Sequence, residues 1–228
     1  GVPSMTRMTA RAMMGMRVRA PYTLWDMALD TVGLLDALDI ERAHVVGASM
    51  GGMIAQCLAI RHGDRLRSMT SFMSTSGDRR TFRPDPRAVG ALLGKRPDTR
   101  EGAQEYFVHL TKTFAGPGWA LDEDEIRRLA GVTYDRGHHP AGFMRQWAAI
   151  LAGGNRTRDL RTVSTPTLVM HGSQDPLLHP DGGRATARAI PGARLEIIEG
   201  LGHSMPRAAL PAIVRPIIKH CQAADAAG

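Results

Sequence analysis

The sequence is poor in cysteine and has no long apolar run. Its two cysteines, Cys57 and Cys221, lie far apart in the 228 residues and lack the spacing of metal ligands. They imply no disulfide framework, so we expect a protein of the reducing cytoplasm with no metal site. No window approaches the roughly 20 uninterrupted apolar residues that a membrane span requires, and we expect no such span.

Positive charge is in excess, but the sequence lacks the patterns of nucleic-acid-binding proteins. The 29 Lys and Arg residues outnumber the 22 Asp and Glu residues, which gives a net charge of +7. These basic residues are scattered or interleaved with acids, as in residues 79–87, and no RNP, zinc-finger or homeodomain signature is present. We therefore expect no nucleic-acid partner. The length suits one globular core, with room for a small inserted subdomain.

The most informative stretch surrounds Ser49. A valine-rich run ends in a G-x-S-x-G pentapeptide at residues 47–51, and the apolar residues after it recur at helical spacing. This pattern predicts a strand, a sharp turn and a helix, with the Ser49 hydroxyl lifted clear of the sheet near the helix N-terminus. Unpaired N–H groups favour negative charge there. The alternative is a glycine-rich turn that only packs tightly.

The first part of the chain alternates helices with strands. A helical stripe over residues 24–38 begins at Thr23, a candidate N-cap, with Asp26 three residues later. A strand at 43–48, a helix to about residue 61 and a strand at 66–74 follow. This alternation predicts an α/β fold, in which helices cover both faces of a parallel sheet. Residues 1–20 are interpreted as an inserted loop or an interior segment.

Residues 77–161 form a helical insertion in this interpretation. They contain no convincing strand, and helical patches at 88–93, 102–114, 122–130 and 141–151 are punctuated by prolines. The last patch carries Phe143 and Trp147, which we assign to substrate binding. The alternative is that these aromatic residues pack the insertion onto the core.

Two further predicted strands end near polar residues that could activate a serine nucleophile. A strand predicted at 165–172 leads to Asp175, and a helix is expected after it at 181–190. A strand predicted at 194–199 leads to His203, and a last helix is expected at 210–221. The carboxyl ends of parallel strands lie along one edge of a sheet, so Ser49, Asp175 and His203 should meet there. A serine hydroxyl becomes a nucleophile when an imidazole takes its proton and a carboxylate orients that imidazole.

Each residue also has a simpler interpretation when it is taken alone. Asp175 precedes Pro176 and could be a turn residue, and His203 could be a surface-loop histidine. The other histidines, among them His171 at a strand end, have no comparable position and are interpreted as structural or solvated. The order Ser, Asp, His at three strand ends favours the catalytic interpretation.

The motifs together resemble the α/β-hydrolase superfamily, in particular esterases of the group around aclacinomycin methylesterase and proline iminopeptidase-like hydrolases. The resemblance rests on residues 47–52, 166–176 and 200–203, and covers the chain from Tyr22 onward. It implies that Ser49 is the nucleophile, His203 the general base and acid, and Asp175 the orienting carboxylate. It also implies a discontinuous core of residues 1–76 and 162–228, and a cap of residues 77–161.

The sequence departs from this family upstream of Ser49. Family members have further strands there, and a loop that supplies one of two oxyanion N–H groups. Only about 20 residues precede Tyr22, so we expect a chain that lacks the amino-terminal strands. The other donor, the N–H of Met50, is present. A missing donor is ordinarily worth about 10² to 10³ in turnover, which puts the activity of this chain by itself in question.

The leading hypothesis is a serine hydrolase that acts on small carboxylic esters through an acyl-enzyme, without a metal or organic cofactor. A second hypothesis keeps the same triad for amides, peptide amino termini or peracid formation, because the cap and not the triad selects the substrate. A third is a non-catalytic binding protein on the same fold, which the short amino end would suit.

Overall fold

The computed structural model describes residues 5–137 and 139–227 and contains one four-stranded parallel sheet. Its strands are β1 (Ala43–Ala48), β2 (Leu66–Phe72), β3 (Thr167–Gly172) and β4 (Arg194–Ile198). They lie in the order β1-β2-β3-β4, with one irregularity of register between Ala43 and His44. All four strands were predicted from the sequence, and the observed bounds lie within two residues of the expected ones.

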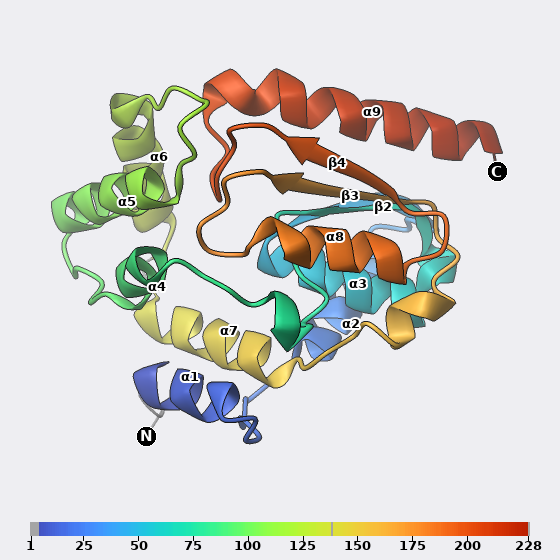
Figure 1. The fold of residues 1–228 in the computed structure, drawn as a ribbon, viewed down its shortest axis with the longest axis horizontal. Helices are drawn as coiled ribbons and strands as arrows, with labels where there is room; N and C mark the ends of the chain where they lie inside the picture. The colour runs from blue at the N-terminus through green and yellow to red at the C-terminus, as the bar shows by residue number, and fades with distance from the viewer. Residues whose placement is uncertain (1–4, 138, 228) are drawn as a thin grey trace.

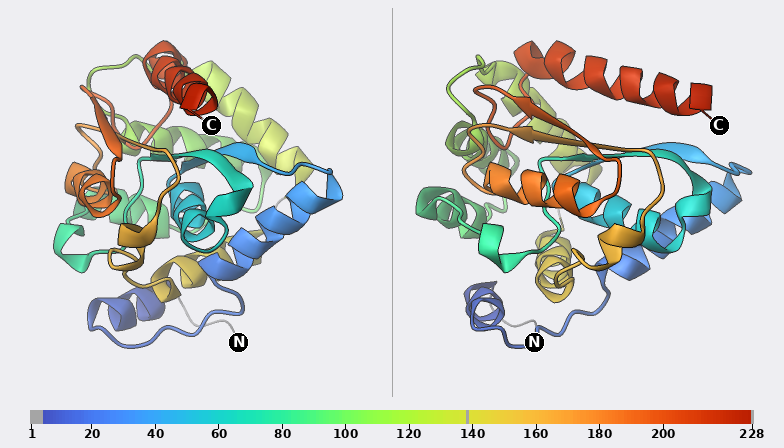
Figure 2. Two further views of the ribbon diagram at one scale, coloured as in Figure 1. Left: turned by 90° about the vertical axis from the view of Figure 1, so that its right-hand side faces the viewer. Right: turned by 45° about the vertical axis from the view of Figure 1, so that its right-hand side comes forward.

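Helices cover both faces of the sheet, as the sequence predicted. On one face lie α3 (Met50–Arg61) and α8 (Pro180–Ala189), with α2 (Leu24–Ala37) packed on α3. On the other face lies α9 (Leu210–Ala227) (Figures 1 and 2). Parallel strands need crossover connections, and α3 between β1 and β2 and α8 between β3 and β4 lie in two of them.

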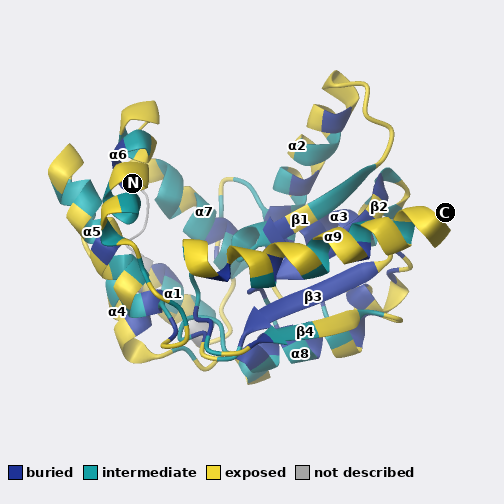
Figure 3. Cartoon of the chain, turned by 90° about the horizontal axis from the view of Figure 1, so that it is seen from above, coloured by how far each residue is buried: buried dark blue, intermediate teal, exposed yellow. Residues whose placement is uncertain are grey.

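Two apolar clusters fill the space between these layers. One joins α2 and α3 to the sheet through side chains such as Leu24, Leu58 and Met69. The other joins the opposite face to α9, with Phe72 and Ile213 among its buried members. Figure 3 shows β3 buried along its whole length, whereas the outward faces of α2 and α9 are exposed.

The start of α2 follows the predicted capping pattern. The Thr23 hydroxyl accepts the N–H of Asp26 at 3.3 Å, and the Asp26 carboxylate accepts the Thr23 N–H at 2.7 Å. Each side chain thus satisfies a backbone donor that a helix end leaves unpaired. These hydrogen bonds hold the pKa of Asp26 below its ordinary value.

The segment between β2 and β3 is helical and lies beyond the carboxyl ends of the strands (Figure 1). It contains α4 (Pro86–Leu93), α5 (Arg100–Phe114), α6 (Glu123–Arg136) and α7 (Pro140–Ala152). Each corresponds to one of the predicted helical patches. Short 3-10 helices occupy Gly63–Arg65, Arg79–Thr81, Asp159–Thr162 and Arg207–Ala209.

A buried arginine ties the two ends of this insertion together. The Arg156 backbone N–H donates to the Ser76 carbonyl at 2.8 Å, and its guanidinium donates to the Thr75 carbonyl at 2.8 Å and to Gln56 of α3 at 3.2 Å. Arg156 is 2% exposed, and burial lowers the pKa of its guanidinium. The entry and exit of the insertion are therefore fixed to α3 by one side chain.

The amino-terminal segment forms a helix, α1 (Met5–Met13), where the sequence suggested an inserted loop or interior segment. It packs against α7, and Met8 is buried beside Ala148 there. The helix was missed because Met, Thr and Arg alternate too closely for a clear apolar stripe, and its burial depends on a partner about 140 residues away. None of the described helices is long and apolar enough to cross a membrane.

The turn between β1 and α3 depends on Gly47. A Cβ at this position would lie 2.1 Å from the Gly51 carbonyl oxygen and 2.7 Å from the Gly52 nitrogen, both of which are backbone atoms. We predict that Gly47→Ala destabilises the protein by about 1–3 kcal/mol, the usual cost of overpacking, as measured by urea unfolding.

The matched control is Gly33→Ala in α2, where an added Cβ meets no atom within 4 Å. It should stabilise the protein by up to about 1 kcal/mol, because alanine is the better helix former. Equal free energies of unfolding for the two variants would contradict the packing argument.

Candidate active site

Ser49 lies on the turn between β1 and α3 and has a strained backbone. Its φ of 54° and ψ of −117° are unusual for a residue with a side chain. Two hydrogen bonds hold this geometry: the Ser49 N–H donates to the Phe72 carbonyl at 2.9 Å, and the Ser74 hydroxyl donates to the Ser49 carbonyl at 2.8 Å. The strain is therefore supported from β2 and the residues that follow it.

The structure brings Ser49, His203 and Asp175 into one hydrogen-bonded chain. The Nε2 atom of His203 lies 3.0 Å from the Ser49 Oγ, and its Nδ1 atom lies 2.7 Å from the Asp175 Oδ2. The side chain of Asp175 is 0% exposed and that of His203 is 7% exposed. The predicted meeting of these three residues at the carboxyl edge of the sheet is thus what the structure shows.

The charge of Asp175 assigns the direction of these hydrogen bonds. Burial opposes its ionisation, but hydrogen bonds from His171 and His203 outweigh burial and lower the pKa of Asp175 to about 2. Its other oxygen, Oδ1, accepts the N–H groups of Leu177 and Leu178 at 2.9 and 2.8 Å. The ionised carboxylate therefore accepts from Nδ1 of His203, which leaves Nε2 free to accept the Ser49 hydroxyl proton.

The loop that carries His203 packs against the end of α5. The His203 N–H donates to the Phe114 carbonyl at 2.7 Å, and the two rings meet edge to face with centroids 5.8 Å apart. This close approach needs the glycine before His203, because a Cβ on Gly202 would lie 2.1 Å from the Phe114 oxygen. A residue of the helical insertion thereby fixes the imidazole.

The predicted oxyanion donor is the first residue of α3. Ser49 is the N-cap of this helix, so the Met50 N–H belongs to the first turn, where helical geometry supplies no acceptor. The dipole of α3 adds partial positive charge at the same place. An oxygen that becomes negative beside Ser49 would be stabilised there.

The two aromatic residues assigned to substrate binding have other partners. The indole N–H of Trp147 donates to the Thr9 hydroxyl of α1 at 3.0 Å. The guanidinium carbon of Arg96 lies 3.6 Å above the centre of the Phe143 ring, a cation–π contact. These contacts account for both side chains as packing residues, and their role toward a substrate stays a prediction.

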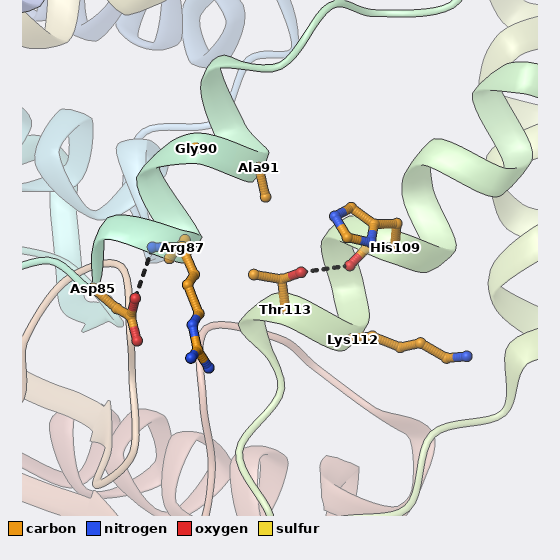
Figure 4. Close-up of a pocket in the computed structure, with 8 residues that line it drawn as sticks. Asp85, Arg87, Gly90, Ala91, His109, Lys112 and Thr113 are labelled. Atoms are coloured by element: carbon orange, nitrogen blue, oxygen red, sulfur yellow. Dashed lines mark hydrogen bonds between the residues drawn. The ribbon is translucent and has the colours of Figure 1, made fainter.

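A groove of about 640 Å³ lies between α4 and α5 (Figure 4). Basic side chains, a capping aspartate and small residues line it: Asp85, Arg87, Ala88, Gly90, Ala91, His109, Lys112 and Thr113. The Asp85 N–H donates to the Pro176 carbonyl at 2.7 Å, so one wall of the groove is tied to the loop of Asp175. The lining does not include Ser49, and the groove is separate from the Ser49 hydroxyl.

Three residues of the site were not predicted from the sequence. Ser74 and Phe114 act through a hydroxyl and a backbone carbonyl, and their partners are distant in sequence. His171 was interpreted as structural or solvated, although its place four residues before Asp175 at the end of a strand was a usable signal. Among the described residues, no group of three or more His, Cys, Asp or Glu side chains could hold a metal ion.

Comparison with known proteins identifies the family to which the chain is similar. A family model described as the alpha/beta hydrolase fold matches residues 4–206. The rhodomycin D methylesterases DauP of Streptomyces sp. (strain C5) and DnrP of Streptomyces peucetius are 30% and 29% identical, and each alignment covers 90% of this chain and 75% of the relative.

Solved structures share the fold. A thermophilic esterase from Thermogutta terrifontis superposes with a TM-score of 0.68 at 22% identity, over 92% of this chain and 75% of the other. The meta-cleavage product hydrolase CumD from Pseudomonas fluorescens IP01 gives 0.66 at 22% identity, over 91% and 73%. Because the family model spans most of the sequence, this chain belongs to the alpha/beta hydrolase fold family.

Proposed function

We propose that the protein is a serine hydrolase that cleaves small carboxylic esters through an acyl-enzyme. The observation that carries this proposal is the hydrogen-bonded chain from Ser49 through His203 to Asp175. The names of the two methylesterase relatives support an ester of a carboxylic acid as the bond that is cleaved. The strained backbone of Ser49 supports a functional role for this residue, because such strain clusters at functional sites.

In the proposed reaction, His203 Nε2 takes the hydroxyl proton while the Ser49 Oγ bonds to the ester carbonyl carbon. The carbonyl oxygen becomes negative and is stabilised by the Met50 N–H. The intermediate then collapses: the bond to the alcohol oxygen breaks, and the alcohol takes the proton from His203. Asp175 remains ionised and stabilises the imidazolium throughout.

Water then hydrolyses the acyl-enzyme, with water as the nucleophile and the Ser49 oxygen as the leaving group. His203 takes a proton from water as the water oxygen bonds to the acyl carbon, and the Ser49 oxygen leaves with that proton. The products are a carboxylic acid and an alcohol, and Ser49 is regenerated. These steps use only side chains and backbone groups of this chain, so the mechanism calls for no cofactor.

An ester is favoured over an amide by the names of the methylesterase relatives. The distinction can be measured with a panel of p-nitrophenyl esters against aminoacyl anilides. Faster turnover of the anilides would assign the same three residues to amide hydrolysis.

We predict that a fluorophosphonate probe labels the folded protein at Ser49 and that Ser49→Ala abolishes both labelling and p-nitrophenyl ester hydrolysis. Ser49 is expected to react because its hydroxyl donates to His203 at 3.0 Å. Peptide mass spectrometry identifies the labelled residue. Protein unfolded in urea is the control and should not react, and undiminished hydrolysis by Ser49→Ala would overturn the proposal.

We predict that Asp175→Asn lowers kcat by about 10⁴-fold with little change in folding, because an amide stabilises the wrong tautomer of His203. Steady-state kinetics and circular dichroism measure the two effects. Asp181→Asn is the matched control: this aspartate lies nearby in α8, pairs at its half-exposed carboxylate with His179 and Arg184, and should keep its activity. Similar kcat values for the two variants would contradict the assigned role.

A further inference from the structure

His171 is a second imidazole on the carboxylate of Asp175. It lies near the end of β3 and is 0% exposed. Its Nε2 atom lies 2.7 Å from the Leu178 carbonyl oxygen and 3.2 Å from the Asp175 Oδ2. The mechanism proposed above does not use this residue, yet it contacts the same oxygen that accepts from His203.

The surroundings of His171 determine which nitrogen carries its proton. Nδ1 is buried and has no hydrogen-bond partner among the described residues. A proton there would be an unpaired buried donor, and it would leave the lone pair of Nε2 facing two oxygen atoms. The proton of the imidazole is therefore assigned to Nε2.

The ring of His171 is closely packed on the side of α8. Helix α8 packs directly on it at Gly183, where an added Cβ would lie 2.6 Å from Nδ1 of His171. Two titratable side chains lie against the Asp175 carboxylate: His203 of the loop after β4, hydrogen-bonded at 2.7 Å, and His171 of β3, with its Nε2 at 3.2 Å.

We propose that His171 is a positioning residue, whose Nε2–H fixes the Asp175 carboxylate and draws off part of its negative charge. The inference rests on the proposed function, since it concerns how Asp175 acts on His203. Oδ2 lies 2.7 Å from Nδ1 of His203 and 3.2 Å from Nε2 of His171, whose N–H also faces the Leu178 carbonyl, and Oδ1 accepts two backbone N–H groups. Loss of the His171 N–H would leave more negative charge on the oxygen that faces the Nδ1–H of His203.

The low pKa of Asp175 agrees with this arrangement. Burial works against ionisation, and the contacts of the carboxylate with His171 and His203 outweigh it. The carboxylate is therefore stabilised by His171 of β3 as well as by His203, which contacts Ser49.

The test compares variants that differ in whether a donor reaches Asp175. His171→Phe keeps a planar ring and removes the donor, whereas His171→Gln places an amide N–H near the position of Nε2. His171→Asn carries the same amide at the shorter reach of Nδ1 and serves as the matched control for a buried amide. If the Phe variant does not fold, as judged by circular dichroism, the Gln and Asn pair decides.

The readout is the pH midpoint at which the His203 ring protons titrate by NMR, which requires no turnover. We expect the Phe and Asn variants to shift this midpoint upward by about 0.5 to 1 pH unit, the effect of one ordinary hydrogen bond, and the Gln variant to match the parent. An unchanged or lowered midpoint in the variants without the donor would overturn the inference.

A parallel measurement separates this inference from the proposed function. The rate of fluorophosphonate labelling at Ser49 is followed against pH for the parent and the variants, and its acid limb should move with the NMR midpoint. A parent protein that is not labelled would contradict the proposed function, while the NMR titration still tests His171. A labelled parent with an unshifted Phe variant would overturn the role of His171 alone.

Discussion

The hydrogen bond between His203 and Ser49 joins loops that follow the two opposite outer strands of the sheet. Ser49 follows β1 and His203 follows β4, which are the two outer strands in the order β1-β2-β3-β4. Neighbouring strands lie about 4.8 Å apart, so the strand ends are separated by about 14 Å, and the loop after β4 must close that distance. The 3.0 Å hydrogen bond between His203 and Ser49 therefore depends on the contacts that direct this loop across the edge of the sheet.

The helical insertion provides much of that direction. The end of α5 accepts the His203 N–H through the Phe114 carbonyl, and the residue before α4 donates to Pro176 beside Asp175. Arg156 joins both ends of the insertion to α3, the helix that begins next to Ser49. All three loops of the candidate site therefore depend on the insertion, which helps to position Ser49, Asp175 and His203.

The sequence predicted the parts of this arrangement that follow from local pattern. The strands, most helices and the meeting of Ser49, Asp175 and His203 follow from periodicity and from the rule that parallel strands end at one edge. The contact of Phe114 with His203 was not predictable, because it joins residues about 90 positions apart through a backbone carbonyl. Helix α1 and the partners of Trp147 and Phe143 were missed for the same reason: each depends on tertiary packing, which leaves no local signal.

Ser49 and His203 follow opposite outer strands of the sheet, and this placement has a mechanical consequence. Parallel sheets are twisted, and a change of twist rotates the first strand against the last far more than it rotates adjacent strands. Asp175 follows β3, next to β4, so its distance from His203 is insensitive to such a motion, whereas the distance from His203 to Ser49 changes with it. The twist of the sheet is thus a second determinant, beside the helical insertion, of the distance between the imidazole and the serine.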